Sequence, residues 1–426
     1  MPSVNNVKLT IGGAETTAGT AVSREYVLPV RSLPALNKTV ERAPDPAIVG
    51  RNMDAGGFAV ADNVAGTIPL SIRPCGGVGQ IFKSLLGTEE SPTTFGSAVR
   101  IRYTGSSASA KLVMTSGTAI RSLIGTLGSE SADANFGTAG VITVYNASYD
   151  LVSEFVSAVN GYSQYTCAKI AGLDNASIGT AVTDERQGKN TWAWFFPNGS
   201  AGAYRHTFTP DLGSTERPTY TLQYDGRQGN QIYDGVVINS LTITAALKGM
   251  VEADADILGF DETSTATSST LTLEDIDPLI FHDGSFTIGA NEYTYIRNVS
   301  LTIMNNHNAE GYGQGDISRL YHQKGKFEVT GQAQVRLDAT SFAERTKVTS
   351  GDTAAISLYF KGEDIDTDRP YMMIVEIPYC TIEDFAFQEN AGVIDATISF
   401  KATYPKGTVY NDPFAVHLIT DDSAAY

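Results

Sequence analysis

The feature that most constrains the fold of this chain is an internal repeat. Residues 208–218 recur as residues 360–370, with six matching positions that are all 152 residues apart and no gap between them. The segments that follow also match: Thr219–Tyr224 with Tyr371–Ile377, and 237–243 with 381–387. A repeat of this length predicts two structural units of the same kind, so it must be settled before the domains are counted.

The last matching segments of the two copies indicate strands. Apolar residues occupy every second position in both: Val251, Ala253, Ala255 and Ile257 in the first copy, and Ile394, Ala396, Ile398 and Phe400 in the second. An alternation with period two is typical of a strand that buries one face and exposes the other.

Composition narrows the function more than the fold. The chain has 47 acidic and 30 basic residues, and its net charge is −17. A protein that grips DNA or RNA needs a basic face, so this charge has the wrong sign for that role. The three cysteines lie far apart and form no CxxC pair, which argues against a zinc site and favours a reducing compartment. We find no secretory signal and no apolar run near the ~18 residues of a membrane helix.

The order of segments predicts a discontinuous organisation. Each copy reads as a strand, a long loop, a strand and a short helix, followed by the matching strands. The expected parts are an extended or disordered arm (1–23), a first unit (24–95 and 190–259), an inserted α+β domain (96–189), a linker (260–279), a second unit (280–410) and a tail (411–426).

The helix expected in the first unit is Gly76–Gly87, which carries an apolar stripe: Val78, Ile81, Phe82, Leu85 and Leu86. Side chains at this spacing share one helical face, and Gly87 provides a stop signal. The second unit offers a shorter candidate, Ala339–Lys347. The expected long loops are Pro34–Gly57 and Asn305–Lys326.

Motifs for catalysis and cofactor binding are absent. The two Gly-Lys pairs are not followed by Ser or Thr, no histidine is followed by Glu as in HExxH, and no Gly-x-Ser-x-Gly occurs. The acids of Asp364–Asp368 have the spacing of a calcium loop, but Arg369 stands where that loop needs glycine, which favours a plain turn. We predict no catalytic residue, no cofactor and no metal site.

The order of these segments resembles the tail tube protein of long-tailed (siphovirus-type) bacteriophages, in a duplicated form. The resemblance covers roughly residues 24–95 and 190–410. It is carried by Gly57-Phe58, Gly66–Arg73, Gly79–Gly87, His206–Phe208, Pro218–Leu222, Tyr233–Leu241, Ile377–Tyr379 and Gly392–Ala402. It implies a mainly β fold of two tandem tail-tube-type β-sandwich or barrel units, each with a short packing helix, plus a small α+β insertion.

The resemblance also implies a function. Such a chain is a structural virion protein, not an enzyme, that assembles itself into stacked rings and forms the hollow tail tube through which DNA is ejected. Many relatives have one unit and close six subunits into a ring, so a duplicated chain implies a trimer. The implied partners are other copies, the tail-terminator, tail-tip and tape measure proteins, and double-stranded DNA that passes without specific binding. No membrane is involved, and assembly is expected in the bacterial host cytoplasm.

Two other functions stay open at this stage. One is a phage tail-tip or surface adhesion module built of stacked β domains. The other is a β enzyme acting on polysaccharides, which needs paired acids among aromatic residues in one groove. Both tryptophans, Trp192 and Trp194, stand beside Phe195 and Phe196, and we interpret this cluster as core packing under the insertion.

Two sets of residues are candidates for the tube's surfaces. Glu252, Asp254 and Asp256 share the face opposite the apolar one, and Asp395 is the weaker match in the second copy. We expect the apolar face to pack on helix 78–86 and the acids to face the lumen, where they would repel phosphate. The loops are too long for idle connections and are expected to stack rings, through Pro34, Asn37, Asp45, Arg51, Asn306, His307, Tyr312, Arg319 and Tyr321.

Overall fold

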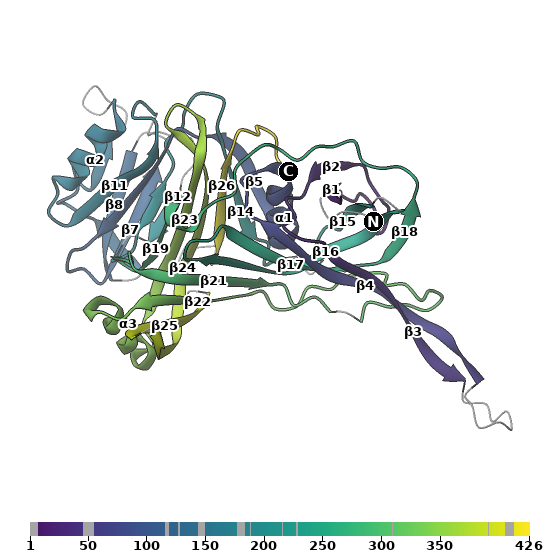
Figure 1. The fold of residues 1–426 in the computed structure, drawn as a ribbon. Helices are drawn as coiled ribbons and strands as arrows, with labels where there is room; N and C mark the ends of the chain where they lie inside the picture. The colour runs from purple at the N-terminus through teal and green to yellow at the C-terminus, as the bar shows by residue number, and fades with distance from the viewer. Residues whose placement is uncertain are drawn as a thin grey trace.

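The computed structural model describes residues 7–45, 55–115, 119–126, 128–143, 150–176, 184–187, 189–214, 216–226, 229–308, 310–390, 392–404 and 413–426. Most of these residues lie in antiparallel strands, and the architecture is mainly β, as predicted (Figure 1). The strands form three connected layers and a separate inserted block. Among the described residues, no helix is long and apolar enough to cross a membrane.

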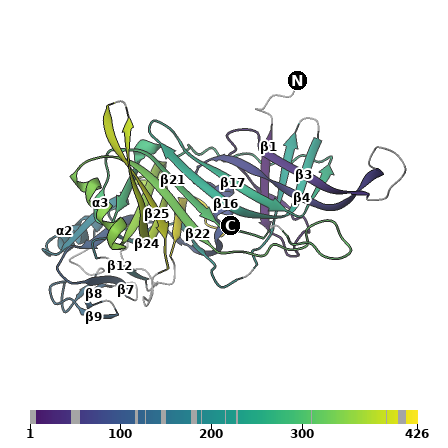
Figure 2. The ribbon, with the colours of Figure 1, turned by 90° about the horizontal axis from the view of Figure 1, so that it is seen from below.

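The long sheet is the largest of these layers. Its eight strands pair in the order β3 (Ala35–Asp45), β4 (Ala55–Ser71), β17 (Val251–Gly259), β16 (Gly229–Ala246), β21 (Ile296–Met304), β22 (Glu328–Arg336), β25 (Val393–Ala402) and β24 (Arg369–Asn390). Figure 2 shows these strands side by side. The order β3-β4-β17-β16 in the first half is repeated as β21-β22-β25-β24 in the second.

A second sheet faces the long sheet across the core. It consists of β5 (Gly87–Thr94), β14 (Tyr204–Pro210), β26 (Ala415–Thr420), the first half of β24, β23 (Thr353–Asp366) and β19 (Gly284–Ile288), with β20 (Asn291–Glu292) at the edge. β24 is long enough to serve both sheets. Its first residues pair with β23 and β26, and its last residues pair with β25.

A third layer closes the end of the first unit. β2 (Arg24–Val27), β1 (Lys8–Ala14), β15 (Tyr220–Gly226), the first half of β16 and β18 (Asp261–Thr265) pair in this order. Helix α1 (Gly76–Leu86) packs between this layer and the long sheet, with its apolar side chains in the main core. Gly87 ends the helix in the left-handed conformation, at φ 89°, as predicted.

The inserted block has a hydrophobic core of its own. One sheet consists of β11 (Tyr165–Gly172), β6 (Ser97–Tyr103) and β13 (Ala193–Phe195); the other of β12 (Asp184–Gln187), β7 (Ser109–Thr115), β8 (Ala119–Thr126), β10 (Val141–Thr143) and β9 (Ser129–Ala132). Helix α2 (Val152–Asn160) completes this α+β insertion. Trp194 is fully buried where the block meets the second sheet, so the aromatic cluster is core packing, as interpreted.

Three segments differ from the expectation of loose ends and connections. The arm at 1–23 is not disordered throughout, because β1 is hydrogen-bonded to β15 and β2 and buries Leu9 and Ile11. The linker at 260–279 contains β18 and buries Leu279. The tail at 411–426 contains β26, which lies between β14 and β24 with every residue buried.

The loop expected at Pro34–Gly57 is also wrong, since β3 and β4 form a long hairpin there. This hairpin projects from the body of the molecule, at the lower right of Figure 1. The other expected loop, Asn305–Lys326, has no regular strand among its described residues. Helix α3 (Ala339–Ser350) follows β22 as predicted, one turn longer than expected, and a 3-10 turn at Phe281–Asp283 precedes β19.

Candidate functional site

The long sheet turns a polar face away from the core. Beside Glu252 the registers place Thr244, Ser300, Gln332 and Ser399 in successive strands; beside Asp254 they place Thr242, Thr302 and Thr330. We call this set, together with Asp256 and Thr397, the polar face. It is rich in hydroxyl and amide groups because each strand alternates between core and solvent.

The three predicted acids of the first copy lie together on the polar face. Arg31 donates a hydrogen bond to Asp254 over 2.6 Å and lies 3.5 Å from Glu252. Asp256 accepts hydrogen bonds from the hydroxyls of Thr67 and Ser240, at 2.6 and 2.8 Å. The side chains of Glu252 and Asp254 remain 40% and 47% exposed although Arg31 pairs with both of them.

The opposite, apolar face of β17 is buried in the main core. Val251, Ala253, Ala255 and Ile257 share this core with the apolar stripe of α1, as the sequence indicated. Burial of one face and exposure of the other explains why the acids can occupy alternate positions of a core strand without a desolvation cost.

Asp395 differs from the three acids with which the sequence grouped it. Its side chain is fully buried, and Arg297 donates a hydrogen bond to it from β21 over 2.5 Å. Gln334 donates a second one at 3.3 Å. The prediction that Asp395 presents an open acidic surface is therefore wrong in this chain, because a neighbouring strand supplies a cation at the same position.

The residues predicted to stack rings fall into three groups. Asn37 in β3, and Asn306 and Tyr321, are exposed, and Tyr312 is half-buried. His307, Arg319 and Pro34 are buried against the chain itself. Asp45 ends β3, and Arg51 lies outside the described residues. Because the set contains both exposed and buried residues, only part of it is open to another molecule.

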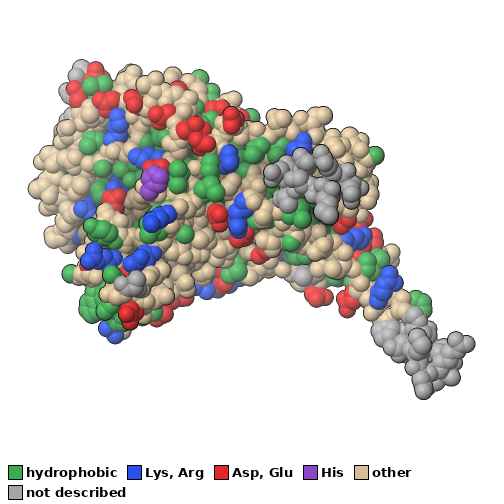
Figure 3. Space-filling model, viewed as in Figure 1, with side chains coloured by type: hydrophobic (Ala, Val, Ile, Leu, Met, Phe, Trp, Pro, Cys, Tyr) green, Lys and Arg blue, Asp and Glu red, His purple; other side chains and the backbone are tan. Residues whose placement is uncertain are grey.

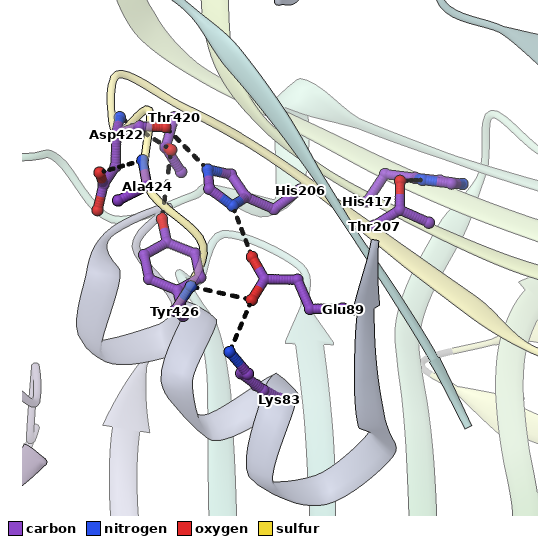
Figure 4. A network of polar contacts seen from close by, with 9 residues as sticks. All are labelled: Lys83, Glu89, His206, Thr207, His417, Thr420, Asp422, Ala424 and Tyr426. Carbon is purple, nitrogen blue, oxygen red and sulfur yellow. Dashed lines mark hydrogen bonds and ion pairs between the residues drawn. The ribbon is translucent and has the colours of Figure 1, made fainter. Parts of the chain in front are cut away.

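A buried polar network, which the sequence did not reveal, fastens residues 421–426 to α1 and β5 (Figure 4). His206 Nδ1 lies 2.9 Å from Glu89 Oε1, and its Nε2 lies 2.9 Å from the carbonyl oxygen of Asp422. Glu89 also accepts from the backbone N–H of Tyr426 at 2.9 Å and pairs with Lys83 at 3.2 Å. Because a carbonyl oxygen only accepts, Nε2 carries a hydrogen.

This network holds structure together and offers no substrate an approach. His206 and Glu89 have almost no exposed side-chain surface, and the Tyr426 ring stacks on the imidazole at 4.4 Å. The signal for it was the apolar run 414–419, which marks β26, but nothing in the sequence pairs Glu89 with His206. The His206–Asp211 pair that the sequence could suggest does not form: the His206 ring contacts Glu89 and Asp422, while Asp211 accepts from the backbone of Gly213 and Ser214.

Other reactive groups on the described residues are buried or exposed singly. Burial raises the pKa of the Cys75 thiol to about 12 and raises the pKa of the Cys167 and Cys380 thiols further. Asp366, in the calcium-like run, forms an ion pair with Arg369. Within the described residues, no group of three or more His, Cys, Asp or Glu side chains could hold a metal ion.

The surface charge on the side shown in Figure 3 is mixed in sign. Acidic and basic side chains are intermixed over the face shown in Figure 3, without a continuous basic area. A cavity of about 440 Å³ lies beside the turn between β16 and β17, lined mainly by apolar residues that include Phe281, Phe286, Tyr293 and Phe360. The polar part of its lining includes Lys248, His282, Ser285 and Glu292.

Comparison with known proteins is consistent with this architecture. No curated protein matches the chain. The family described as phage tail tube protein matches residues 5–402, which span both copies of the repeat, the insertion and the long sheet. This chain, whose largest sheet repeats one order of strands and turns a polar face outward, therefore belongs to the phage tail tube protein family.

Proposed function

We propose that three copies of this chain close into a ring of six units, and that these rings stack into the hollow tail tube through which phage DNA is ejected. The chain acts as a structural subunit and not as an enzyme. Family membership supports a virion component that assembles with itself and with other tail proteins. The ring is supported by the way the two halves of the long sheet join.

The junction between the halves is a pair of strands. β16 and β21 pair from Ser240–Met304 to Ala246–Asn298. In the repeat, the last half of β24 corresponds to β16. The position of β3 corresponds to that of β21, since each is the first strand in its half. Among the described strands, β3 pairs only with β4, and residues 383–390 of β24 pair only with β25.

The long sheet therefore ends in the two strands that the junction joins. An exposed strand edge tends to pair with another strand, and a ring removes the edge altogether. Pairing β24 of one copy with β3 of the next would repeat the β16–β21 junction between chains. This observation carries the proposal.

The junction also predicts the register of the contact. The repeat relates Thr242 to Ala386, and the strand pairs relate Thr302 to Asn37. Ala386 is then expected opposite Asn37, and Phe387 opposite Leu36. The side chain of Phe387 is 50% exposed, whereas its counterpart Ile243, inside the junction, is 5% exposed. A neighbouring copy would bury Phe387 in the same way.

The polar face is proposed to line the lumen. The uncharged hydroxyl and amide side chains of this face make no strong bond to passing phosphates. The carboxylates of Glu252, Asp254 and Asp256 repel those phosphates. Threefold symmetry and stacking would repeat these acids around and along the tube. Double-stranded DNA is then a passing molecule, while the tail-terminator, tail-tip and tape measure proteins are the proposed partners, all assembled in the host cytoplasm.

The division into two units with an inserted domain is part of this proposal. The insertion has its own core and contacts the second sheet through Trp194 and the ion pair of Arg100 with Glu292, at 2.7 Å. The second sheet lies on the side of the core opposite the polar face. We therefore place the insertion on the outer wall of the tube, away from the lumen.

Electron microscopy of the purified chain tests the function as a whole. Hollow filaments, or rings at low concentration, are expected, and native mass spectrometry should find three chains in each ring. Compact trimers that never stack would instead favour the tail-tip or adhesion module. Six chains in each ring would overturn the tandem arrangement.

A disulfide tests the junction itself. Asn37→Cys with Ala386→Cys should link neighbouring copies by a disulfide. The largest covalent species seen by non-reducing electrophoresis should then be a trimer. Thr39→Cys with Ala386→Cys, which shifts the register by two residues, serves as the matched control and should link poorly. Equal linking by both pairs would rule out the register.

A further inference from the structure

Two connections at equivalent positions of the long sheet have the same length. The strand pairs relate Leu36 to Leu301 before the connection and Gly66 to Gly331 after it, a shift of 265 positions in both cases. The first connection, residues 40–62, and the second connection, residues 305–327, therefore contain equal numbers of residues. The first continues straight as the projecting hairpin of β3 and β4 (Figure 1). The second does not.

The second connection is nevertheless a hairpin. Isolated antiparallel bridges join Asn308 to Gln323 and Tyr312 to Arg319, and the N–H of Leu320 donates to Gly311 O at 2.8 Å. These pairs centre on the same point of the connection as the pairs of β3 and β4 do. The repeat thus contains one structural element in two conformations, one straight and one lying on the first unit.

Contacts with the base of the first hairpin hold the second connection in place. The Tyr312 hydroxyl donates to the Asp62 carbonyl at 2.8 Å, and Arg319 Nη2 donates to Asn63 Oδ1 at 2.7 Å. The N–H of Asp62 donates to Ile317 O at 2.8 Å. These bonds replace the interstrand bonds that a straight hairpin would make with itself.

A second anchor lies closer to β22. His322 Nε2 donates to the carbonyl oxygen of Gly235 at 2.7 Å, and the His322 ring stacks on Phe260 at 4.6 Å. Lys324 donates to the carbonyl oxygen of Asp211. The second connection therefore binds three separate parts of the first unit.

The first connection lacks the side chains that would let it bind in the same way. A shift of 265 positions sets Tyr312 against Ala47, Arg319 against Asp54 and His322 against Gly57. None of these three residues can donate the side-chain hydrogen bonds of its counterpart. The difference in sequence thus explains the difference in conformation.

The conformation in which the second connection lies on the first unit also leaves buried polar groups without hydrogen bonds. Arg217 is buried, and none of its side-chain nitrogens has a hydrogen-bond partner among the described residues; the carboxylate of Asp211 lies 3.9 Å away. The counterpart of Arg217 in the repeat, Arg369, donates to the carbonyls of Ser200 and Phe95, at 2.6 and 3.0 Å. A buried polar group without a partner destabilises the state that buries it.

We propose that the second connection is a docking element for another copy of this chain, held against its own first unit until the chains assemble. Released, it would project like the first connection and present its apolar side chains, Ile317, Leu320 and Tyr321, which are 40%, 48% and 45% exposed. The first connection already exposes Val40, Phe58 and Val60. This proposal rests on the assembly of copies set out above.

A reversible lock tests the release. The Ser318 hydroxyl donates to Asp62 Oδ2 at 3.2 Å, so Asp62→Cys with Ser318→Cys can fix the second connection by a disulfide. The oxidised double variant should stay free of tubes and form them after a reductant is added. Each single variant is the control and should assemble with or without reductant. Normal tubes from the locked chain would overturn the proposal.

A second variant loosens the same contacts. Arg319→Asp with His322→Gly gives the second connection, at these two positions, the residues that the first connection has. Trypsin should then cleave at Lys324 or Lys326 several-fold faster, and the lag before tubes form should shorten several-fold. An unchanged lag despite faster cleavage counts against a holding role. If the unmutated chain formed no tubes under any condition, the proposed function would fail before this inference was reached.

Discussion

At the scale of single residues, two glycines show how closely the long sheet is packed. Gly66 and Gly331 occupy corresponding places in the repeat. A Cβ atom at Gly66 would lie 2.0 Å from the carbonyl oxygen of Ala35, and one at Gly331 would lie 2.3 Å from the ring of Phe400. Neither position has room for a side chain; the nearest obstacle is backbone at Gly66 and the Phe400 ring at Gly331, where the carbonyl oxygen of Ser300 is also 2.9 Å away.

Gly66→Ala and Gly331→Ala should both lower the thermal midpoint of unfolding. Overpacking of this kind costs about 1–3 kcal/mol. The larger effect is expected at Gly66, because the backbone of β3 moves less easily than the ring of Phe400. Gly229→Ala is the matched control, since a Cβ atom there meets nothing within 4 Å. Equal midpoints for all three variants would contradict the packing argument.

Two buried histidines make stability depend on pH. The pKa of His307 is lowered to about 4, mainly by burial and then by the nearby cations Arg217, Lys324 and Arg319, while a hydrogen bond with the backbone of Gln323 opposes them. Burial likewise lowers the pKa of His322 to about 3, with Arg319 and His307 adding to the effect while the bond to Gly235 opposes it. The unfolded chain therefore takes up protons before the folded chain does.

Their contribution is complete above pH 6.5 and is lost as the pH falls towards 4, by about 3 kcal/mol for each histidine. Unfolding midpoints measured from pH 7 to pH 4 should fall more steeply for the unmutated chain than for His307→Gln with His322→Gln. Parallel curves would show that these rings are not the groups that titrate.

At the scale of elements, the two helices at corresponding positions of the repeat play different parts. Ten of the eleven residues of α1 are buried, and Phe82 has no exposed surface. α3 buries only Ser341 and Glu344, and 47% of Phe342 is exposed. α1 is therefore part of the core, whereas α3 lies over the edge strand β24.

Phe82→Ala should destabilise the free chain by about 3–5 kcal/mol, because it leaves a cavity in a packed core. Phe342→Ala is the comparison at the other helix and should change the free energy of unfolding by less than about 1 kcal/mol. Denaturant titration of the two variants measures both values. A large loss for Phe342→Ala would mean that α3 carries core packing after all.

Elements with strong periodicity could be predicted from sequence, and those defined by their partners could not. The apolar stripe of α1 and the alternation in β17 sufficed for both. The β3–β4 hairpin was missed because Pro44 and the glycines at 56 and 57 read as loop signals, although an edge strand tolerates them. The burial of Asp395 depends on Arg297 in another strand, which no local pattern shows.

At the scale of the whole molecule, the polar face turns eight strands into one continuous surface. β17 contributes three acids to it, whereas β22 and β25 contribute Glu328 and Lys401, which form an ion pair at 3.2 Å beside hydroxyl and amide groups. The acids of β17 therefore form a band on this surface. In a narrow channel, the fields of such bands would add along the axis.

Glu252→Lys, Asp254→Lys and Asp256→Lys together should leave assembly intact, since exposed ion pairs such as those of Arg31 contribute little. DNA ejection should slow or stall, most strongly at low salt, where the charges are least screened. Ejection rates of phage that carry the triple variant measure this. A second triple variant, Glu252→Gln with Asp254→Asn and Asp256→Asn, removes the negative charges without adding positive ones. Comparing the two triple variants distinguishes the loss of the acids from the gain of positive charge.

Asp150→Lys with Glu154→Lys, which reverses two exposed acids on the insertion, is the control for charge reversal away from the polar face. It should eject DNA at the normal rate, because the insertion is placed outside the tube. A triple variant of β17 that ejects at the normal rate would show that the acids are merely solvated.

The pairing of β26 sets a limit on when this protein can finish folding. Residues 415–420 lie between β14 and β24, so the second sheet is complete only after those residues have left the ribosome. β1 likewise waits for β15, about half the chain later. Contacts this distant in sequence form slowly, while the insertion, with a core of its own, can fold during synthesis. The second sheet is therefore expected to form later than the core of the insertion.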